Sequence, residues 1–388
     1  MPDISGRLDI ALHRDNDRPT VTISSSRPVT AARVFAGKPV MEVARRLPML
    51  FSICATAQAQ TCALACEQAL GVEPSASALA LRALLLRAET VKEHLWRLLL
   101  DWPKALGREP ATEAMAAGMR AYLALRAEQT AGADPFAPGA DPGPFDAARA
   151  GTQASALAAL VAMHVFGRDP GRWLVDVSDP DALGYWAESA GTGPARLALA
   201  LMREGLADLG RNDVPALPAL SARSLAESMS GPAADAFVAT PTFAGCPHET
   251  TPLARSRGQP LVAALAQVSG NGLLPRLAAL LVELAAAASE LSRPPPATPS
   301  PAVEPTAEGI GIGAAEAARG LLVHRVEVEH DLVRSYRILA PTEWNFHPDG
   351  VVAAGLAGLF AEAADLERRA RLYVTAVDPC VDYALSIA

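Results

Sequence analysis

Two isolated cysteines near opposite ends of the chain are the residues best suited to chemistry. Cys54 lies in the segment FSICATAQ, and Cys380 follows Asp378 and Pro379 close to the end of the 388-residue sequence. Thiolates are soft ligands that favour transition metals such as nickel, iron, copper and zinc. Neither cysteine has a CxxC partner that would complete a zinc site by itself. A two-thiolate site therefore requires a fold that brings both ends of the chain together.

The remaining candidates favour structural roles. Cys62 and Cys66 are spaced i,i+4 and could supply half a metal site, but their alanine-rich surroundings favour core packing. The segment Cys-Pro-His that ends at His248 has no second motif nearby, which favours an exposed loop. Other polar side chains have simple interpretations: a buried ion pair for Glu249 and Arg255, a solvated helix face for Glu89 and His94, and structural positions for His324, His347, Trp344 and Asn345.

The composition indicates an alanine- and leucine-rich helical protein. Hydrophobic residues make up 50% of the chain and aromatic residues only 5%. A net charge of −8, without a cluster of lysine and arginine, argues against a general nucleic-acid binder. Five widely spread cysteines do not form a disulfide framework, so we expect a reducing, cytoplasmic location.

No feature of the sequence predicts secretion or membrane insertion. The first seven residues lack a basic region followed by an apolar run. No uncharged apolar stretch reaches the roughly 18 residues that a membrane-spanning helix needs. The most apolar candidate, 273–291, contains Arg276, Glu283 and Glu290, which predicts an amphipathic soluble helix.

The periodicity predicts an α+β fold that is predominantly helical, with small antiparallel sheets near both termini. Alternating residues near the start are typical of a hairpin, whereas three- and four-residue spacing through the middle is typical of helices. Proline cannot continue a helix, so a proline-rich stretch predicts a surface linker. We expect one domain with four regions: a hairpin at about 6–40, a helical core at about 41–291, the linker at about 292–306, and strands and a helix at about 307–388.

Six short segments follow one another along nearly the whole chain. They are the hairpin at 7–35, SICATA at 52–57, ETTPLAR at 249–255, EAARG at 316–320, PTEWN at 341–345 and DPC at 378–380. Together, and in this order, they resemble the large subunit of nickel–iron hydrogenases. The resemblance implies that family's helical fold, in which the first and last motifs meet at the metal centre.

The departures from that family are as informative as the matches. In the hydrogenases each terminal motif carries two cysteines, of which the first binds nickel and the second bridges nickel and iron. Cys54 and Cys380 match the first cysteines, whereas Ala57 and Tyr383 replace the second ones, and Ser386 replaces the final histidine. The sequence stops shortly afterwards, so we expect no extension for a maturation protease to remove. Two thiolates cannot supply the four of a mature centre, so we expect no hydrogen-splitting enzyme.

This pattern resembles the HupK and HoxV group of hydrogenase expression/formation proteins, which look like degenerate large subunits. The resemblance implies a non-catalytic maturation scaffold that transiently holds an iron–cyanide–carbonyl intermediate, without nickel. Cys54 and Cys380 would be the metal ligands, Arg319 would donate hydrogen bonds to a cyanide nitrogen, and Asp378 would orient Arg319. The implied partners are a small hydrogenase maturation chaperone with its iron-carrying complex, and the precursor of the hydrogenase large subunit.

Two other functions are compatible with the same residues. The first is a divergent hydrogenase-like oxidoreductase with a reduced metal site, which would contain nickel and iron and react with hydrogen. The second is a paralogue that only binds maturation factors through the shared surface, for which both cysteines would be dispensable.

Overall fold

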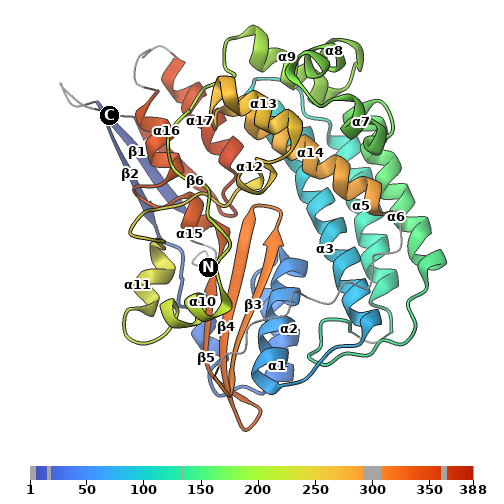
Figure 1. The fold of residues 1–388 in the computed structure, drawn as a ribbon, viewed down its shortest axis with the longest axis vertical. Helices are drawn as coiled ribbons and strands as arrows, with labels where there is room; N and C mark the ends of the chain where they lie inside the picture. Colours follow the sequence, from blue (N-terminus) through green and yellow to red (C-terminus); the bar gives the residue numbers. More distant parts are fainter. Residues whose placement is uncertain (1–5, 15–18, 133, 292–306, 360–364, 388) are drawn as a thin grey trace.

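The structure is a computed structural model that describes residues 6–14, 19–132, 134–291, 307–359 and 365–387. Two small three-stranded sheets lie beside a bundle of long helices (Figure 1). The predicted class, a predominantly helical α+β fold with small sheets, is confirmed.

The first sheet joins the two ends of the chain. It has the strand order β2-β1-β6, formed by β1 (Leu8–Arg14), β2 (Pro19–Ser25) and β6 (Tyr383–Ile387). The hairpin of β1 and β2 is antiparallel, as predicted, but β6 pairs with β1 in parallel. The strands and helix predicted at about 307–388 did not include a strand after the last helix. The five-residue β6 is too short to show a reliable alternating pattern, which explains why it was missed.

The second sheet is antiparallel, with the order β3-β4-β5. Its strands are β3 (Ile310–Ala317), β4 (Gly320–Glu329) and β5 (Leu332–Leu339). His330 and Asp331 form the predicted turn between β4 and β5, with φ angles of 49° and 62°. Two consecutive residues with positive φ are the signature of the tight hairpin turn that suits the twist of paired strands.

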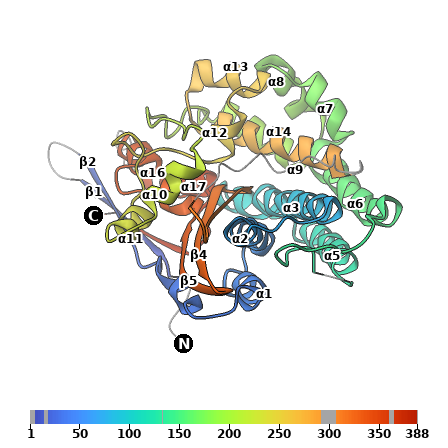
Figure 2. The ribbon, with the colours of Figure 1, turned by 60° about the horizontal axis from the view of Figure 1, so that its bottom comes forward.

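Helix α2 (Ala55–Leu70) packs directly on the backbone of β3 (Figure 2). The approach is possible because Gly311 and Gly313 present no side chain to the helix. A Cβ atom on Gly313 would lie 2.0 Å from the carbonyl oxygen of Thr61, and one on Gly311 would lie 1.8 Å from that of Ala65. The two glycines therefore set the distance between α2 and the sheet.

Shorter helices surround this second sheet. They are η1 (Ala31–Phe35), α1 (Val40–Leu50), α10 (Ala222–Ser228), α11 (Ala234–Ala239) and α15 (Pro341–Asn345). The side chains of α1, α2 and the sheet form a hydrophobic cluster separate from that of the helical bundle, which includes Leu47, Leu322 and Tyr336.

The helical bundle holds the main hydrophobic core. Its members are α3 (Ala76–Trp96), η2 (Arg97–Asp101), α4 (Trp102–Ala105), α5 (Thr112–Gln129), α6 (Ala147–Val161), η3 (Ala162–Phe166), α7 (Pro170–Asp176), α8 (Pro180–Ser189), α9 (Gly193–Arg203), α12 (Pro252–Ser256), α13 (Pro260–Ser269), α14 (Leu273–Leu291), α16 (Val351–Ala357) and α17 (Leu366–Val377). Capping side chains start several of these helices: the oxygens of Ser75, Asp179 and Thr192 accept backbone N–H groups at the starts of α3, α8 and α9.

Helix α14 is the centre of this bundle, packed against α3, α6, α7, α12 and α13. Its range agrees with the helix predicted at 273–291, and most of its residues are buried. Its charged side chains are accommodated because they are paired inside the protein. Arg276 donates to Glu249 at 2.6 Å, and Glu283 accepts from Arg255 at 2.7 Å.

Two predictions about polar residues are wrong. Glu249 and Arg255 do not form one ion pair but belong to two, with Arg276 and Glu283 respectively. Glu89 and His94 on α3 are buried, not solvated, because α3 is enclosed by α2, α5 and α14. The linker predicted at about 292–306 lies outside the described residues.

Within the described residues, no single helix is long and apolar enough to cross a bilayer. A bent pair of helices, Ala150–Phe166 with Pro170–Asp176, is long and apolar enough by length and composition alone.

The contact between α2 and β3 can be tested with Gly313→Val. We expect this variant to lose about 1–3 kcal/mol of unfolding free energy or more, because the new side chain would overlap the α2 backbone. Gly184→Ala in α8 is the control, since a Cβ there has nothing within 4 Å. Urea denaturation of the two variants measures the effect, and equal stability would contradict the close packing.

The Glu283 pair predicts a specific pH dependence of stability. Burial raises the pKa of Glu283, but the charges of Arg255 and His94 outweigh it and lower that pKa to about 2. Since the folded pKa lies below the usual value, the pair's stabilisation is complete above the pKa of the unfolded chain and is lost as the pH falls toward 2. Between pH 5 and pH 3, Glu283→Gln should therefore lose less unfolding free energy than the unmodified protein. Glu290→Gln, an exposed site on the same helix, should behave like the unmodified protein in thermal denaturation at both pH values.

Candidate functional site

Cys54 and Cys380 line one cavity, although 325 residues separate them in the sequence. The cavity has a volume of about 100 Å³, and its walls also include Arg27, Thr342 and Arg319. Both cysteines are half-buried and unpaired. The structure thus brings together the two thiols and the arginine that the sequence analysis selected. Their roles as ligands and hydrogen-bond donor remain predictions.

Cys54 is positioned by the start of α2. It is the residue that precedes the first helical turn, and the backbone N–H groups of Thr56 and Ala57 in that turn donate to the buried carboxylate of Glu89 at 2.8 and 2.9 Å. The Gln58 side chain places its Nε2 atom 3.7 Å from the Cys54 sulfur. Burial, together with the charges of Cys380 and Glu89, raises the pKa of the Cys54 thiol to about 12.

Cys380 is positioned by the short connection between α17 and β6. The Thr342 hydroxyl lies 3.0 Å from the Cys380 sulfur, to which it donates, and it accepts from the Cys380 backbone N–H at 3.4 Å. Arg27, which follows β2, donates to the same sulfur from Nη1 at 2.8 Å. Its Nε atom lies 3.1 Å from Glu343. A cation and a hydroxyl therefore compensate negative charge on this sulfur.

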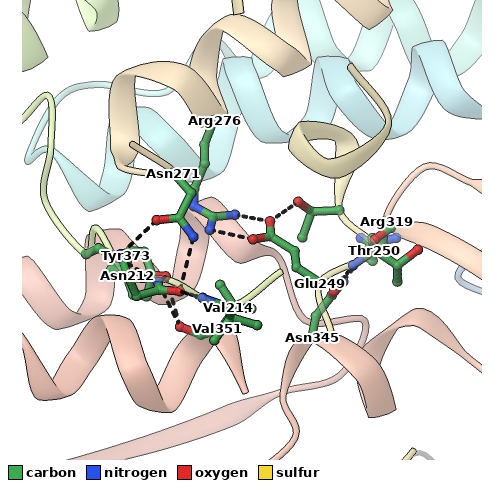
Figure 3. Close-up of polar contacts among 12 residues, drawn as sticks. Asn212, Val214, Glu249, Thr250, Asn271, Arg276, Arg319, Asn345, Val351 and Tyr373 are labelled. Atoms are coloured by element: carbon green, nitrogen blue, oxygen red, sulfur yellow. Dashed lines mark hydrogen bonds and ion pairs between the residues drawn. The ribbon is translucent and has the colours of Figure 1, made fainter. Parts of the chain in front are cut away.

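Arg319 lies in the tight turn between β3 and β4, and its backbone is fixed from two sides (Figure 3). Asn345 Nδ2 donates to the Arg319 carbonyl oxygen at 3.1 Å, while Asn345 Oδ1 accepts from the Thr250 N–H at 2.9 Å. The next residue, Gly320, has a φ of 135°, and a Cβ atom there would lie 2.1 Å from the Thr250 carbonyl oxygen. Glycine is therefore needed at this position for the turn to pack against the backbone of Thr250.

The Arg319 guanidinium is held by two carboxylates. Its Nη2 lies 3.0 Å from Glu93 and its Nε lies 3.1 Å from Asp378 Oδ1. The orienting role of Asp378 stays a prediction. Asp378 Oδ1 also forms an ion pair with Arg97 Nε, at 2.7 Å. Burial raises the pKa of Glu93, but the charges of Arg319 and Lys92 outweigh it, so this pKa lies below its usual range. Glu93 is thus ionised and paired at neutral pH.

Three residues at this site were missed by the sequence analysis: Arg27, Thr342 and Gln58. Thr342 belongs to the PTEWN segment, so that motif pointed to the correct region without identifying the contact. Arg27 is an isolated arginine after a strand, and nothing in its surroundings in the sequence indicates a partner 353 positions away.

A second, wider cavity lies beside the first and has a volume of about 750 Å³. The two cavities share Ser52, Ile53, Arg319, Cys380 and Val381 in their walls. Its other walls are strongly charged, with contributions from α3, η2, α4 and α17. Arg319 and Cys380 are therefore reachable from two sides.

The other sequence candidates lie outside these walls. Cys62 and Cys66 are buried in the core, as predicted, with their sulfurs 3.9 Å apart. Cys246 is exposed, but His248 is buried, so the exposed loop predicted for the latter is wrong. The His248 ring packs edge-on against Phe243 and Trp344.

Neither of the two positions that carry the second cysteines in hydrogenases holds a thiol here. Ala57 is fully buried in α2, and Tyr383 is the first residue of β6. Across the part of the chain that the structure describes, no group of three or more histidine, cysteine, aspartate and glutamate side chains is placed to share a metal ion. Two thiols are thus what the cavity offers to a soft metal.

The chain is similar to known proteins in both sequence and fold. The family model for nickel-dependent hydrogenase matches residues 265–381. The hydrogenase expression/formation protein HoxV of Cupriavidus necator is 33% identical, over 94% of this chain and 92% of the relative. The hydrogenase expression/formation protein HupK of Azotobacter vinelandii is 31% identical over 99% of both chains.

Solved structures of hydrogenases share this fold. The reduced, active nickel–iron–selenium hydrogenase of Desulfomicrobium baculatum superimposes with a TM-score of 0.64 and 14% identity, over 95% of both chains. The reduced enzyme of Desulfovibrio vulgaris Hildenborough gives a TM-score of 0.62 at 15% identity, over 95% of this chain and 94% of the enzyme chain. With its full-length sequence similarity to HoxV and HupK, this chain belongs to the family of hydrogenase expression/formation proteins, a degenerate paralogue of the nickel–iron hydrogenase large subunit.

Proposed function

We propose that this chain is a non-catalytic scaffold in nickel–iron hydrogenase maturation. In this function it receives an iron–cyanide–carbonyl unit from a small maturation chaperone and its iron-carrying complex, in the cytoplasm. It then passes the unit to the precursor of the hydrogenase large subunit. The names of its relatives, hydrogenase expression/formation proteins, support a role in maturation. The observation that carries the scaffold proposal is the cavity shared by Cys54 and Cys380.

The number of thiols favours holding over catalysis. Two thiolates can attach an iron whose remaining ligands are cyanide and carbon monoxide, because soft thiolates suit such a metal. A nickel–iron centre needs bridging thiolates, and their positions are taken by a buried alanine, Ala57, and by Tyr383. The proposal therefore includes iron without nickel as the cargo.

The charges around the thiols suit an anionic cargo with acceptor atoms. A guanidinium has five N–H donors in a planar fork, and the described contacts of Arg319 engage Nε and Nη2 but not Nη1. Arg319 reaches both cavities, so Nη1 is the donor we assign to a cyanide nitrogen. Arg27 would add a second positive charge at the Cys380 sulfur.

The cysteines can be tested by replacing them singly with alanine. Cys54→Ala and Cys380→Ala should each abolish the cyanide and carbonyl stretching bands of protein purified without oxygen from cells that express the other maturation factors. Hydrogenase activity of those cells should fall to background as well. Cys246→Ala, an exposed thiol outside the cavity, is the matched control and should retain the bands.

Other outcomes of this experiment would favour the rival functions. Intact maturation with both cysteines replaced would indicate a paralogue that only docks maturation factors. Nickel together with iron in the purified protein, and hydrogen-dependent reduction of a dye, would indicate a divergent oxidoreductase.

Arg319 provides an independent test. Arg319→Lys keeps the positive charge, but an ammonium group cannot contact Glu93, Asp378 and the cargo in the same plane. We expect about tenfold less bound cargo, the effect of losing one hydrogen bond to a charged group at about 1.5 kcal/mol. Arg325→Lys, another buried arginine on the same sheet, should leave infrared cargo bands unchanged. Equal loss in both variants would indicate a general effect on folding.

A further inference from the structure

A series of buried, hydrogen-bonded side chains extends from the Cys54 sulfur into the core. Gln58 Oε1 lies 2.9 Å from His324 Nε2, and His324 Nδ1 lies 2.8 Å from the Tyr336 hydroxyl. The Tyr336 hydroxyl in turn forms a hydrogen bond with the thiol of Cys62. Gln58, His324 and Tyr336 are each at most 3% exposed, so no solvent competes for these contacts.

The donor and acceptor types restrict how this series can be arranged. Burial lowers the pKa of His324 to about 3, so the ring is neutral and carries one N–H at physiological pH. A neutral imidazole donates from one nitrogen and accepts at the other. Either Nε2 donates to Gln58 and Nδ1 accepts from Tyr336, or both directions are reversed together with the Gln58 amide.

The two directions differ in the quality of their contacts. In the first, the Tyr336 O–H donates to an imidazole nitrogen, a strong acceptor. In the reverse direction, the same O–H would have to donate to the sulfur of Cys62, which is a weak acceptor. The first direction is therefore favoured. It leaves the Gln58 oxygen occupied by His324 and turns the Gln58 NH2 group toward Cys54.

Resting on the proposed function, we infer that Gln58 is a positioning residue for the cargo, with its amide N–H held toward the Cys54 sulfur by His324 and Tyr336. A metal-bound thiolate has no proton and can only accept hydrogen bonds. A fixed N–H donor therefore suits the loaded form of Cys54, in the same way that Thr342 and Arg27 serve Cys380.

The arrangement can be measured directly in the full-length protein without cargo. Labelling the seven histidines with ¹⁵N allows the two ring nitrogens of His324 to be distinguished by NMR. We expect a protonated Nε2, an unprotonated and hydrogen-bonded Nδ1, and no change between pH 6 and pH 8. Tyr336→Phe should shift only Nδ1, toward the value of a nitrogen without a donor. A ring protonated at Nδ1 in the unmodified protein would overturn the inference, whether or not Tyr336→Phe folds.

The consequence for cargo is tested with Gln58→Glu. Glutamate has the same shape and can still accept from His324, but it presents an oxygen to the Cys54 sulfur in place of an N–H group. We expect about tenfold less cargo by infrared spectroscopy, the loss of one charge-assisted hydrogen bond. Gln68→Glu is the matched control on the same helix, because the Gln68 oxygen accepts a backbone N–H from Ile312 and a glutamate oxygen could do the same.

The results separate this inference from the proposed function. If Cys54→Ala loses cargo while Gln58→Glu binds as much as the unmodified protein, Gln58 has no positioning role. If Cys54→Ala also keeps its cargo, the proposed function is wrong, and Gln58 then has no cargo at Cys54 to position. The NMR measurement decides the direction of the amide in either case.

Discussion

The pairing of β6 with β1 is the constraint on which the candidate site depends. The Leu8 N–H donates to the Asp382 carbonyl oxygen at 3.0 Å, two residues after Cys380, so the last strand is fixed against the first. Arg27 lies two residues after β2 of the same sheet and reaches the Cys380 sulfur. One small sheet thus places Cys380 and the Arg27 cation next to each other. Residues of α2 and of the β3–β4 turn form other walls of the cavity.

The opposite wall depends on close contacts between backbones. Because Gly311 and Gly313 let α2 lie on β3, the start of the helix with Cys54 comes close to the turn that carries Arg319. Asn345 then fixes the backbone of that turn, and Glu93 and Asp378 fix its guanidinium. Asp378 itself has a φ of 64°, a left-handed conformation that a non-glycine residue keeps only when its surroundings impose it. Its ion pairs with Arg319 and Arg97 provide that restraint.

Sequence reasoning selected candidate residues that are carried by local motifs. Cys54, Cys380, Arg319 and Asp378 all lie in short segments with recognisable neighbours. In the structure Cys54 lines the first cavity, Asp378 lines the second, and Arg319 and Cys380 line both. Contacts made by isolated residues could not be found in this way. The Arg27–Cys380 contact joins residues 353 positions apart, and no periodicity or spacing connects them.

The same limit explains the errors about burial. Glu89 and His94 on α3 were interpreted as a solvated face because charges on a helix usually face water. Here α3 is enclosed, and these groups find partners on other elements, such as the α2 backbone for Glu89 and Glu283 of α14 for His94. Helical periodicity shows where charges lie around one helix, but not which element covers them.

The two sulfurs differ in a way that bears on release of a metal cargo. Cys380 accepts from a guanidinium and a hydroxyl, whereas Cys54 has only the weaker amide contact, and burial raises its thiol pKa to about 12. If the proposed cargo binds both sulfurs, a thiolate at Cys54 is compensated by fewer donors than one at Cys380. The bond to Cys54 would then be the first to break. Such asymmetry suits a scaffold, which must give up its cargo, better than an enzyme, which must retain its metal.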